Sequence, residues 1–274
     1  ADAEIEQAAA LLIDLGISPV AVGGQTAGAY GEDLPLEGRI HPLLAEDLPD
    51  VQVFGGRPLE SIESIAQIDA DVVLGFDPYF EQVVPEWNEL AEQFDLVTFE
   101  RDLADHRVAL RNLAALLGLE DRAEEAIARF DERIANAPQP DFDIDSIDVF
   151  EIRPDAQTRV HVAGTALTLL ESRGVDVPLI DEVEPDQDST RATFSNELAP
   201  ELLDSAAVMI YSPSRETSAE ILQLLGDDPL LQTLPAVEDG NVFATDVDAL
   251  FFGMAGLDGI ATAFEDLLEE LAAT

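Results

Sequence analysis

The 274-residue chain contains no cysteine and no lysine. Without cysteine it can form neither a disulfide nor a thiolate metal site. All basic residues are arginine, 13 of them against 58 acidic residues, and the formal net charge is −45. Such a charge excludes nucleic acid and anionic lipid surfaces as partners. Uninterrupted apolar runs of about 18 residues are also absent, so no transmembrane helix is predicted.

The acidity is spread along the whole chain, which argues against a local acidic tail. Hydrophobic residues make up 47% of the chain, an ordinary share for a folded protein with a core. Intrinsic disorder is therefore not expected. Molar salt shortens the Debye length to about 3 Å and screens most of the self-repulsion. We interpret the composition as an adaptation to a very salty medium.

Catalytic and metal-ligating patterns are scarce. The three histidines, His41, His106 and His161, are far apart in the sequence and form no ligand-spaced pair. Nucleophile motifs such as Gly-x-Ser-x-Gly are missing. We therefore expect no intrinsic cofactor, no metal site and no enzymatic activity.

Apolar periodicity alternates short strands with helices along nearly the whole chain. Strands are predicted at 19–23, 51–54, 72–75, 96–98, 147–153, 159–163, 207–211 and 242–245. This alternation predicts an α/β fold with mostly parallel sheets covered by helices.

One stretch, residues 102–137, is helical throughout, with a weak interruption at 118–121, and ends at Pro138-Gln139-Pro140. We therefore predict two Rossmann-like lobes, residues 1–101 and 138–274, joined by one long α-helix over 102–137. Ligands of such sheets bind beyond the carboxyl ends of the strands, so a ligand cleft is expected between the lobes.

Three segments resemble one known family when taken in order. They are LIDLGISPVAVG (12–23), PLESIESIAQIDADVVL (58–74) and DPLLQTLPAVEDGNVF (228–243), of which the last is the most specific. They are similar to segments of the substrate-binding proteins of ABC importers for iron–siderophores, haem and cobalamin. Compared with that family, the chain starts almost at the first helix, so the N-terminal lobe is expected to lack its first strand.

The resemblance implies a monomeric extracellular carrier, lipid-anchored at the cell surface, that delivers a metal chelate to a membrane permease. A ferric siderophore is the favoured ligand, with haem or cobalamin as alternatives. A ligand sensor or an enzyme on the same two-lobed scaffold is the alternative from another functional class.

Candidate ligand residues follow predicted strands, because arginine and tyrosine suit anionic, oxygen-rich chelates. Tyr30 follows a glycine-rich stretch, the two phenylalanines could form an apolar wall, and the only tryptophan has core packing as its other interpretation. The set is Tyr30, Arg57, Tyr79, Trp87, Arg153, Arg215, Phe251 and Phe252.

Two acidic residues match the family positions that dock against permease arginines. They are Glu60, in the segment 58–60, and Glu197, in Ser195-Asn196-Glu197-Leu198. Exposed charges far apart orient a rigid carrier on its partner and speed the encounter. Ordinary helix-start carboxylates are the alternative interpretation.

Overall fold

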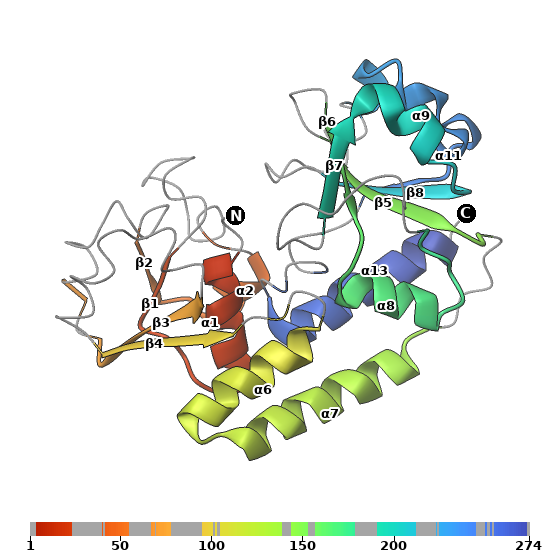
Figure 1. Cartoon of the computed structure of the whole chain (residues 1–274). Coiled ribbons are helices and arrows are strands. Elements are labelled where there is room, and N and C mark those ends of the chain that lie inside the picture. Colours follow the sequence, from red (N-terminus) through yellow and green to blue (C-terminus); the bar gives the residue numbers. More distant parts are fainter. Residues whose placement is uncertain are drawn as a thin grey trace. The chain divides into compact units, whose positions relative to one another are not determined.

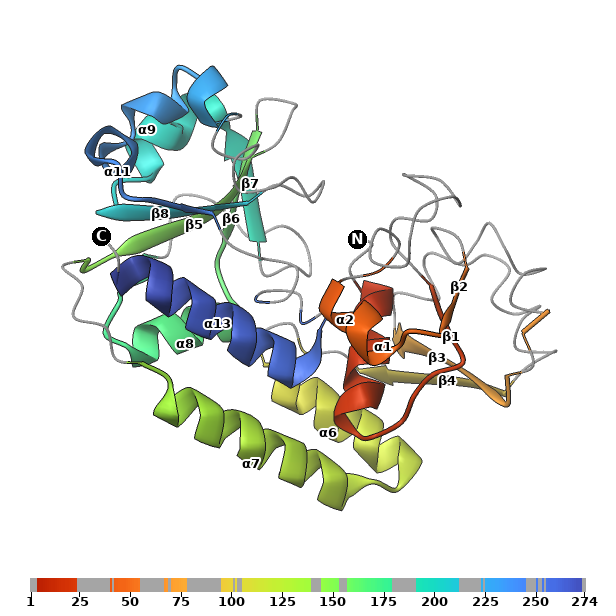
Figure 2. The same ribbon diagram turned by 180° about the vertical axis from the view of Figure 1, so that it is seen from behind.

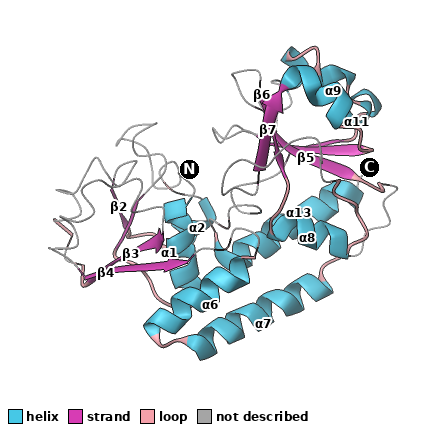
Figure 3. Cartoon of the chain, in the orientation of Figure 1, coloured by secondary structure: helices cyan, strands magenta, loops and turns pink. Residues whose placement is uncertain are grey.

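The chain folds into two compact units in a computed structural model (Figure 1). Unit 1 comprises Ala1–Asn136 and Asp248–Ala261, and unit 2 comprises Ala137–Val247 and Thr262–Thr274. The structure describes residues 4–23, 40, 42–54, 67–68, 70–77, 95–100, 102, 105–138, 144–152, 157–178, 191–211, 223, 225–244, 250, 253 and 255–272. Helices and parallel-rich sheets occur in both units, which confirms the predicted α/β class (Figure 3).

Unit 1 contains two pairs of parallel strands. Strand β1 (Ala21–Gly23) pairs with β2 (Gln52–Phe54), and β3 (Val72–Asp77) pairs with β4 (Asp95–Glu100). The helices α1 (Glu4–Asp14) and α2 (Pro42–Asp47) belong to the same unit. Parts of α1 and α2 bury apolar side chains against β1, in a cluster made of Ala9, Ala10, Val22, Ile40, Leu44, Ala45 and Leu48.

The stretch expected to be one long helix consists of two helices. Helix α6 (His106–Leu117) ends at Gly118, and α7 (Glu120–Asn136) starts two residues later. Gly118 takes a left-handed conformation with φ of 67°, and its N–H donates to the Ala114 carbonyl. This geometry terminates a helix and reverses the chain. The two helices lie side by side in both views and both belong to unit 1 (Figures 1 and 2). The break falls at Gly118, inside the weak interruption that the sequence indicated at 118–121.

Unit 2 is built on a five-stranded sheet in the order β7-β6-β5-β8-β9. Its strands are β5 (Ile147–Ile152), β6 (Gln157–His161), β7 (Arg191–Ser195), β8 (Ala207–Tyr211) and β9 (Val242–Ala244). Strands β5, β8 and β9 run parallel, whereas β6 is antiparallel to both of its neighbours. Strand β7 was not predicted, although its alternating burial is typical of a strand with one covered face.

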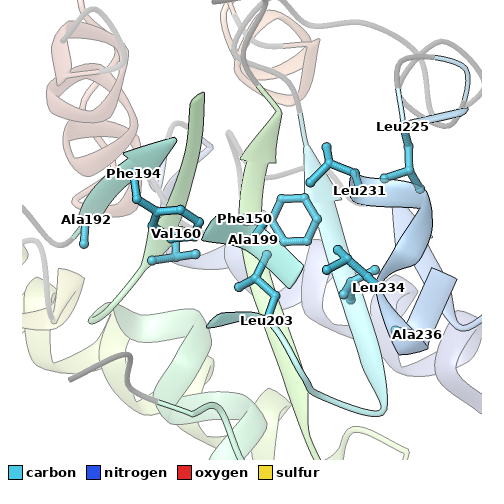
Figure 4. Close-up of a cluster of buried hydrophobic side chains, with 11 residues drawn as sticks. Phe150, Val160, Ala192, Phe194, Ala199, Leu203, Leu225, Leu231, Leu234 and Ala236 are labelled. Carbon is cyan, nitrogen blue, oxygen red and sulfur yellow. The ribbon is translucent and has the colours of Figure 1, made fainter. Parts of the chain in front are cut away.

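Short helices follow the strands of unit 2. They are α8 (Thr165–Ser172), the 3₁₀ turn η3 (Asn196–Leu198), α9 (Ala199–Leu202), η4 (Leu231–Thr233) and α11 (Pro235–Asp239). One face of the sheet packs against α9, η4 and α11 through an apolar core (Figure 4). The labelled core residues are Phe150, Val160, Ala192, Phe194, Ala199, Leu203, Leu225, Leu231, Leu234 and Ala236.

Helix α13 (Gly256–Ala272) is shared, since residues 256–261 belong to unit 1 and residues 262–272 to unit 2. The segment 248–261 therefore belongs with the N-terminal unit, whereas the sequence placed it in the C-terminal lobe. Within the described residues, no helix combines the length and the apolar character needed to cross a membrane.

Candidate functional site

Of the candidate residues from the sequence, Glu197 lies in the described part of the chain. The other docking candidate, Glu60, lies outside it. All the ligand candidates also lie outside the described residues, namely Tyr30, Arg57, Tyr79, Trp87, Arg153, Arg215, Phe251 and Phe252. These candidates stay predictions.

Glu197 is exposed on the turn η3, directly after the carboxyl end of β7. Ser195 caps this turn, because its hydroxyl accepts the Glu197 backbone N–H at 3.4 Å. The neighbouring Leu198 is exposed as well, at 44%. An acidic and an apolar side chain are thus presented together on one short turn.

Hydrogen bonds of the buried Asn196 side chain hold this turn in place. The side chain of Asn196, which is buried, accepts from the Thr158 hydroxyl at 2.9 Å and donates to the Asp228 carboxylate at 2.6 Å. Asp228 in turn accepts the backbone N–H groups of Leu230 and Leu231 at 2.9 and 3.4 Å. The position of Glu197 is therefore fixed by contacts to β6 and to the segment before η4.

A group of charged side chains gathers on the sheet face opposite the apolar core. Strand register places Glu151 of β5 opposite Arg159 of β6, and Arg159 opposite Thr193 of β7. The next pair along, His161 and Arg191, faces the same way, because side chains two residues apart share a face of a strand. We call Glu151, Arg159, Arg191 and Thr193 the arginine cluster.

The arginine cluster is centred on one carboxylate oxygen. Glu151 Oε2 lies 3.4 Å from Arg159 Nη1 and 4.0 Å from Arg191 Nη1. Arg159 Nε also donates to the Thr193 hydroxyl at 3.1 Å, which orients its guanidinium. The Glu151 side chain is 1% exposed, whereas the two arginine side chains keep 22% and 21% of their surface in solvent.

His161 lies beside the arginine cluster and is buried. Burial lowers its pKa well below the ordinary value, and the positive charges of Arg191 and Arg159 lower it further. The imidazole is therefore neutral near pH 7.

Sequence reasoning did not select Arg159 or Arg191. Arg159 was treated as part of a strand, and the segment around Arg191 was not predicted to be a strand at all. The alternation Arg191-Ala192-Thr193-Phe194 was the available signal, because it puts two apolar residues on one face and two polar residues on the other.

Among the described residues, no group of three or more histidine, aspartate or glutamate side chains is placed to hold a metal ion. The described histidines, His106 and His161, are buried in different units. The chemistry available in the described part of unit 2 is thus recognition of a charged group by guanidinium side chains, with the exposed Glu197 on a separate turn.

Comparison with known proteins finds one family model that matches part of the chain. Residues 7–140 match the family model described as periplasmic binding protein. No curated protein matches the chain.

Solved structures share the fold over almost the whole chain. SirA of Staphylococcus aureus, complexed with staphyloferrin B, is 15% identical with a TM-score of 0.71, covering 97% of this chain and 90% of SirA. FhuD of Vibrio cholerae, bound to Fe³⁺–Desferal, is 19% identical with a TM-score of 0.67, covering 97% and 95%. The siderophore periplasmic binding protein from the fuscachelin gene cluster of Thermobifida fusca is 22% identical with a TM-score of 0.62, covering 96% and 94%.

These identities are low, so the solved structures establish the fold. The family model matches the sequence itself, and the two findings agree with the two-lobed α/β architecture expected from the residues. Residues 7–140 are therefore similar to the periplasmic binding protein family, and the chain shares the fold of these solved structures.

Proposed function

We propose that this protein is the solute-binding component of an ABC importer and carries an iron(III)–siderophore chelate to a membrane permease. The observation that carries the proposal is the family match combined with the fold shared with three siderophore-binding proteins. Family and fold are those of binding proteins in transport rather than of enzymes. The cargo is therefore bound and released unchanged.

The similarity to the periplasmic binding protein family supports a location outside the cytoplasm, in the periplasm or the extracellular space. The finer proposal is a monomer held at the outer face of the cytoplasmic membrane by a lipid anchor, in a salty medium. The net charge of −45 supports the proposal of a salty medium, because high salt screens the repulsion between like charges.

The proposed contact with the permease uses Glu60 on one lobe and Glu197 on the other. The geometry of Glu197 supports this role, because Glu197 is exposed on a turn that the hydrogen bonds of the buried Asn196 side chain hold in place. A rigidly placed charge orients the carrier on a cationic partner without a large entropy cost.

The test combines ligand binding with transport. The wild-type protein should bind at least one of four chelates by calorimetry in molar salt: a ferric hydroxamate, a ferric catecholate, haem or cobalamin. The variant Glu60→Arg with Glu197→Arg should keep that affinity within about twofold, because neither change touches the cargo, and should lose uptake by more than about tenfold.

Glu238→Arg is the matched control, since Glu238 is also exposed in unit 2 and undergoes the same charge reversal. Uptake should survive this change. Undiminished uptake by the double variant would refute docking through Glu60 and Glu197, whereas failure to bind any of the four chelates would refute the carrier function.

A further inference from the structure

Two large apolar side chains are exposed next to the turn that carries Glu197. Leu198 is 44% exposed and Leu230 is 39% exposed. Among the side chains that the structure describes in unit 2, no other large apolar one is exposed to this extent. A single exposed leucine needs no explanation, but two that lie together form an apolar patch on an otherwise acidic protein. We call Leu198 and Leu230 the leucine pair.

The leucine pair occupies two neighbouring turns. Leu198 is the N-cap residue of α9, and Leu230 is the N-cap residue of η4. Helix α9 packs against η4. In addition, the hydrogen bond from Asn196 Nδ2 to the Asp228 carboxylate, at 2.6 Å, joins the segments directly before the two leucines. Both leucines and Glu197 are therefore presented by one connected part of unit 2.

Helix capping does not account for leucine at either position. N-cap positions favour serine, threonine, aspartate or asparagine, whose side-chain oxygen accepts a backbone N–H, and a leucine side chain has no such acceptor. At the start of η4, the N–H groups of Leu230 and Leu231 are accepted by Asp228 instead. A polar residue would serve the fold at least as well at both positions. Contact with a partner is therefore the better explanation of the leucine pair.

The charges around the leucine pair select the kind of partner. Glu197, Glu201 and Asp227 are exposed on the same two segments. A second copy of this chain would bring these acidic side chains against each other. A surface that carries arginine or lysine beside apolar side chains complements both features. The leucine pair is also continuous with Glu197, the residue proposed to contact the permease.

High salt gives a physical reason for combining the two kinds of contact. In molar salt the Debye length is about 3 Å, so the attraction between exposed charges is weak. Burial of apolar surface is not screened by salt. A carrier that works in the proposed salty medium therefore needs apolar contact to hold its partner, while Glu197 orients the encounter.

We propose that the leucine pair is an apolar docking patch for the permease, adjacent to Glu197, and that it supplies the part of the docking affinity that salt does not screen. The inference rests on the proposed carrier function and deepens it. The matching face of the permease then carries apolar side chains beside a basic residue.

Docking to membranes at two salt concentrations tests the proposal. Right-side-out vesicles that contain the permease are compared with vesicles from a permease deletion strain, and the difference in bound carrier measures specific docking. Leu198→Ser and Leu230→Ser should each weaken docking by roughly tenfold in both about 1 M and about 3 M KCl, as expected for the lost burial of one leucine. Glu197→Gln should weaken docking by less than about threefold at the higher salt, where its charge is screened.

Leu116→Ser is the matched control, because Leu116 is a leucine of α6 in unit 1 that is 53% exposed. This variant should dock as wild type does. Leu198→Met and Leu230→Met keep an apolar surface and should dock several-fold more tightly than the serine variants. The melting temperature of the serine variants should stay within about 3 °C of wild type, since serine suits an N-cap position.

Folded serine variants that dock as tightly as wild type would overturn the proposal, and so would an equal loss in Leu116→Ser. Equal binding to both kinds of vesicle would assign the leucine pair to another membrane component and reject the permease. Sedimentation provides the last check, because a wild-type dimer that the serine variants dissociate would assign the leucine pair to a second copy of the chain and reject the permease as well.

Calorimetric titration with the four chelates separates this inference from the carrier function. A wild type that binds a chelate, together with serine variants that dock normally, would refute the apolar docking patch alone. A wild type that binds neither a chelate nor the permease vesicles would refute both. Chelate affinity should be the same in the serine variants and in wild type, because the leucine pair is proposed to contact the permease and not the cargo.

Discussion

Asp14, one of the described residues, lies where burial disfavours the negative charge of its carboxylate. It ends α1 and accepts the backbone N–H of Leu257, at the start of α13, at 3.0 Å. Burial raises the pKa of Asp14 to about 7, and the nearby Asp258 adds to this, while the hydrogen bond from Leu257 acts in the opposite direction. Gly256 permits the approach, because a Cβ there would stand 2.8 Å from the carboxylate.

The sign of the resulting pH dependence follows from linkage. In the folded protein Asp14 keeps its proton up to a pKa of about 7, whereas in the unfolded chain it loses the proton near the ordinary pKa of 3.8. The folded state therefore binds more protons between these values, and its stability falls as the pH rises from 4 to 7.

Asp14→Asn should remove this loss, since asparagine stays neutral and can still accept from Leu257. We expect the free energy of unfolding of the variant to exceed that of wild type by about 2 kcal/mol at pH 8. This is roughly half of the energy that the whole pKa shift corresponds to, because Asp14 is not fully enclosed and solvent screens part of the effect. Urea denaturation in molar KCl at pH 4 and pH 8 measures it. If the variant and wild type differ in unfolding free energy by the same amount at both pH values, the raised pKa of Asp14 is contradicted.

At the scale of elements, two glycines with left-handed backbones set the connections of unit 1. Gly118 separates α6 from α7, and a Cβ there would meet no atom within 4 Å. Gly253 precedes α13 with φ of 61°, and a Cβ there would lie 2.4 Å from His106 Cδ2. His106 is buried, so it cannot swing away.

Alanine substitutions at Gly118 and Gly253 should therefore lower the free energy of unfolding by different amounts. Gly118→Ala should destabilise by about 1 kcal/mol, the conformational penalty alone. Gly253→Ala should cost about 3 kcal/mol, because a steric clash in a packed region is added. Gly226→Ala is the control, since Gly226 has no positive φ and open space around it, and should change the unfolding free energy by less than about 0.5 kcal/mol. Equal costs for all three in urea denaturation would disprove this reasoning.

At the scale of the whole molecule, the net charge dominates the dependence of stability on salt. A net charge of −45 on 274 residues opposes any compact state at low ionic strength. The ion pair between Arg111 of α6 and Glu124 of α7 joins exposed groups and contributes little to stability. The stability of the fold must then depend on dissolved salt that screens the repulsion between the acidic side chains.

Dialysis from about 2 M to about 10 mM KCl should lower the melting temperature by at least roughly 10 °C or abolish the cooperative transition, because the Debye length grows from below 3 Å to about 30 Å. Circular dichroism melts measure this, with sucrose at low salt as a non-ionic control. A melting temperature independent of salt would refute adaptation to a salty medium.

The amino-acid sequence alone determined the α/β class, the family resemblance and the exposed start of a helical turn at Glu197, because these depend on local periodicity and on motifs continuous in the chain. Periodicity indicated a weak interruption at 118–121 but not a full break with a chain reversal, since the left-handed backbone of Gly118 is a property of the folded turn. The arginine cluster was decided by tertiary structure. Arg159 and Arg191 meet at Glu151 only through the register of β5, β6 and β7, and that register is set by hydrogen bonds between strands distant in sequence.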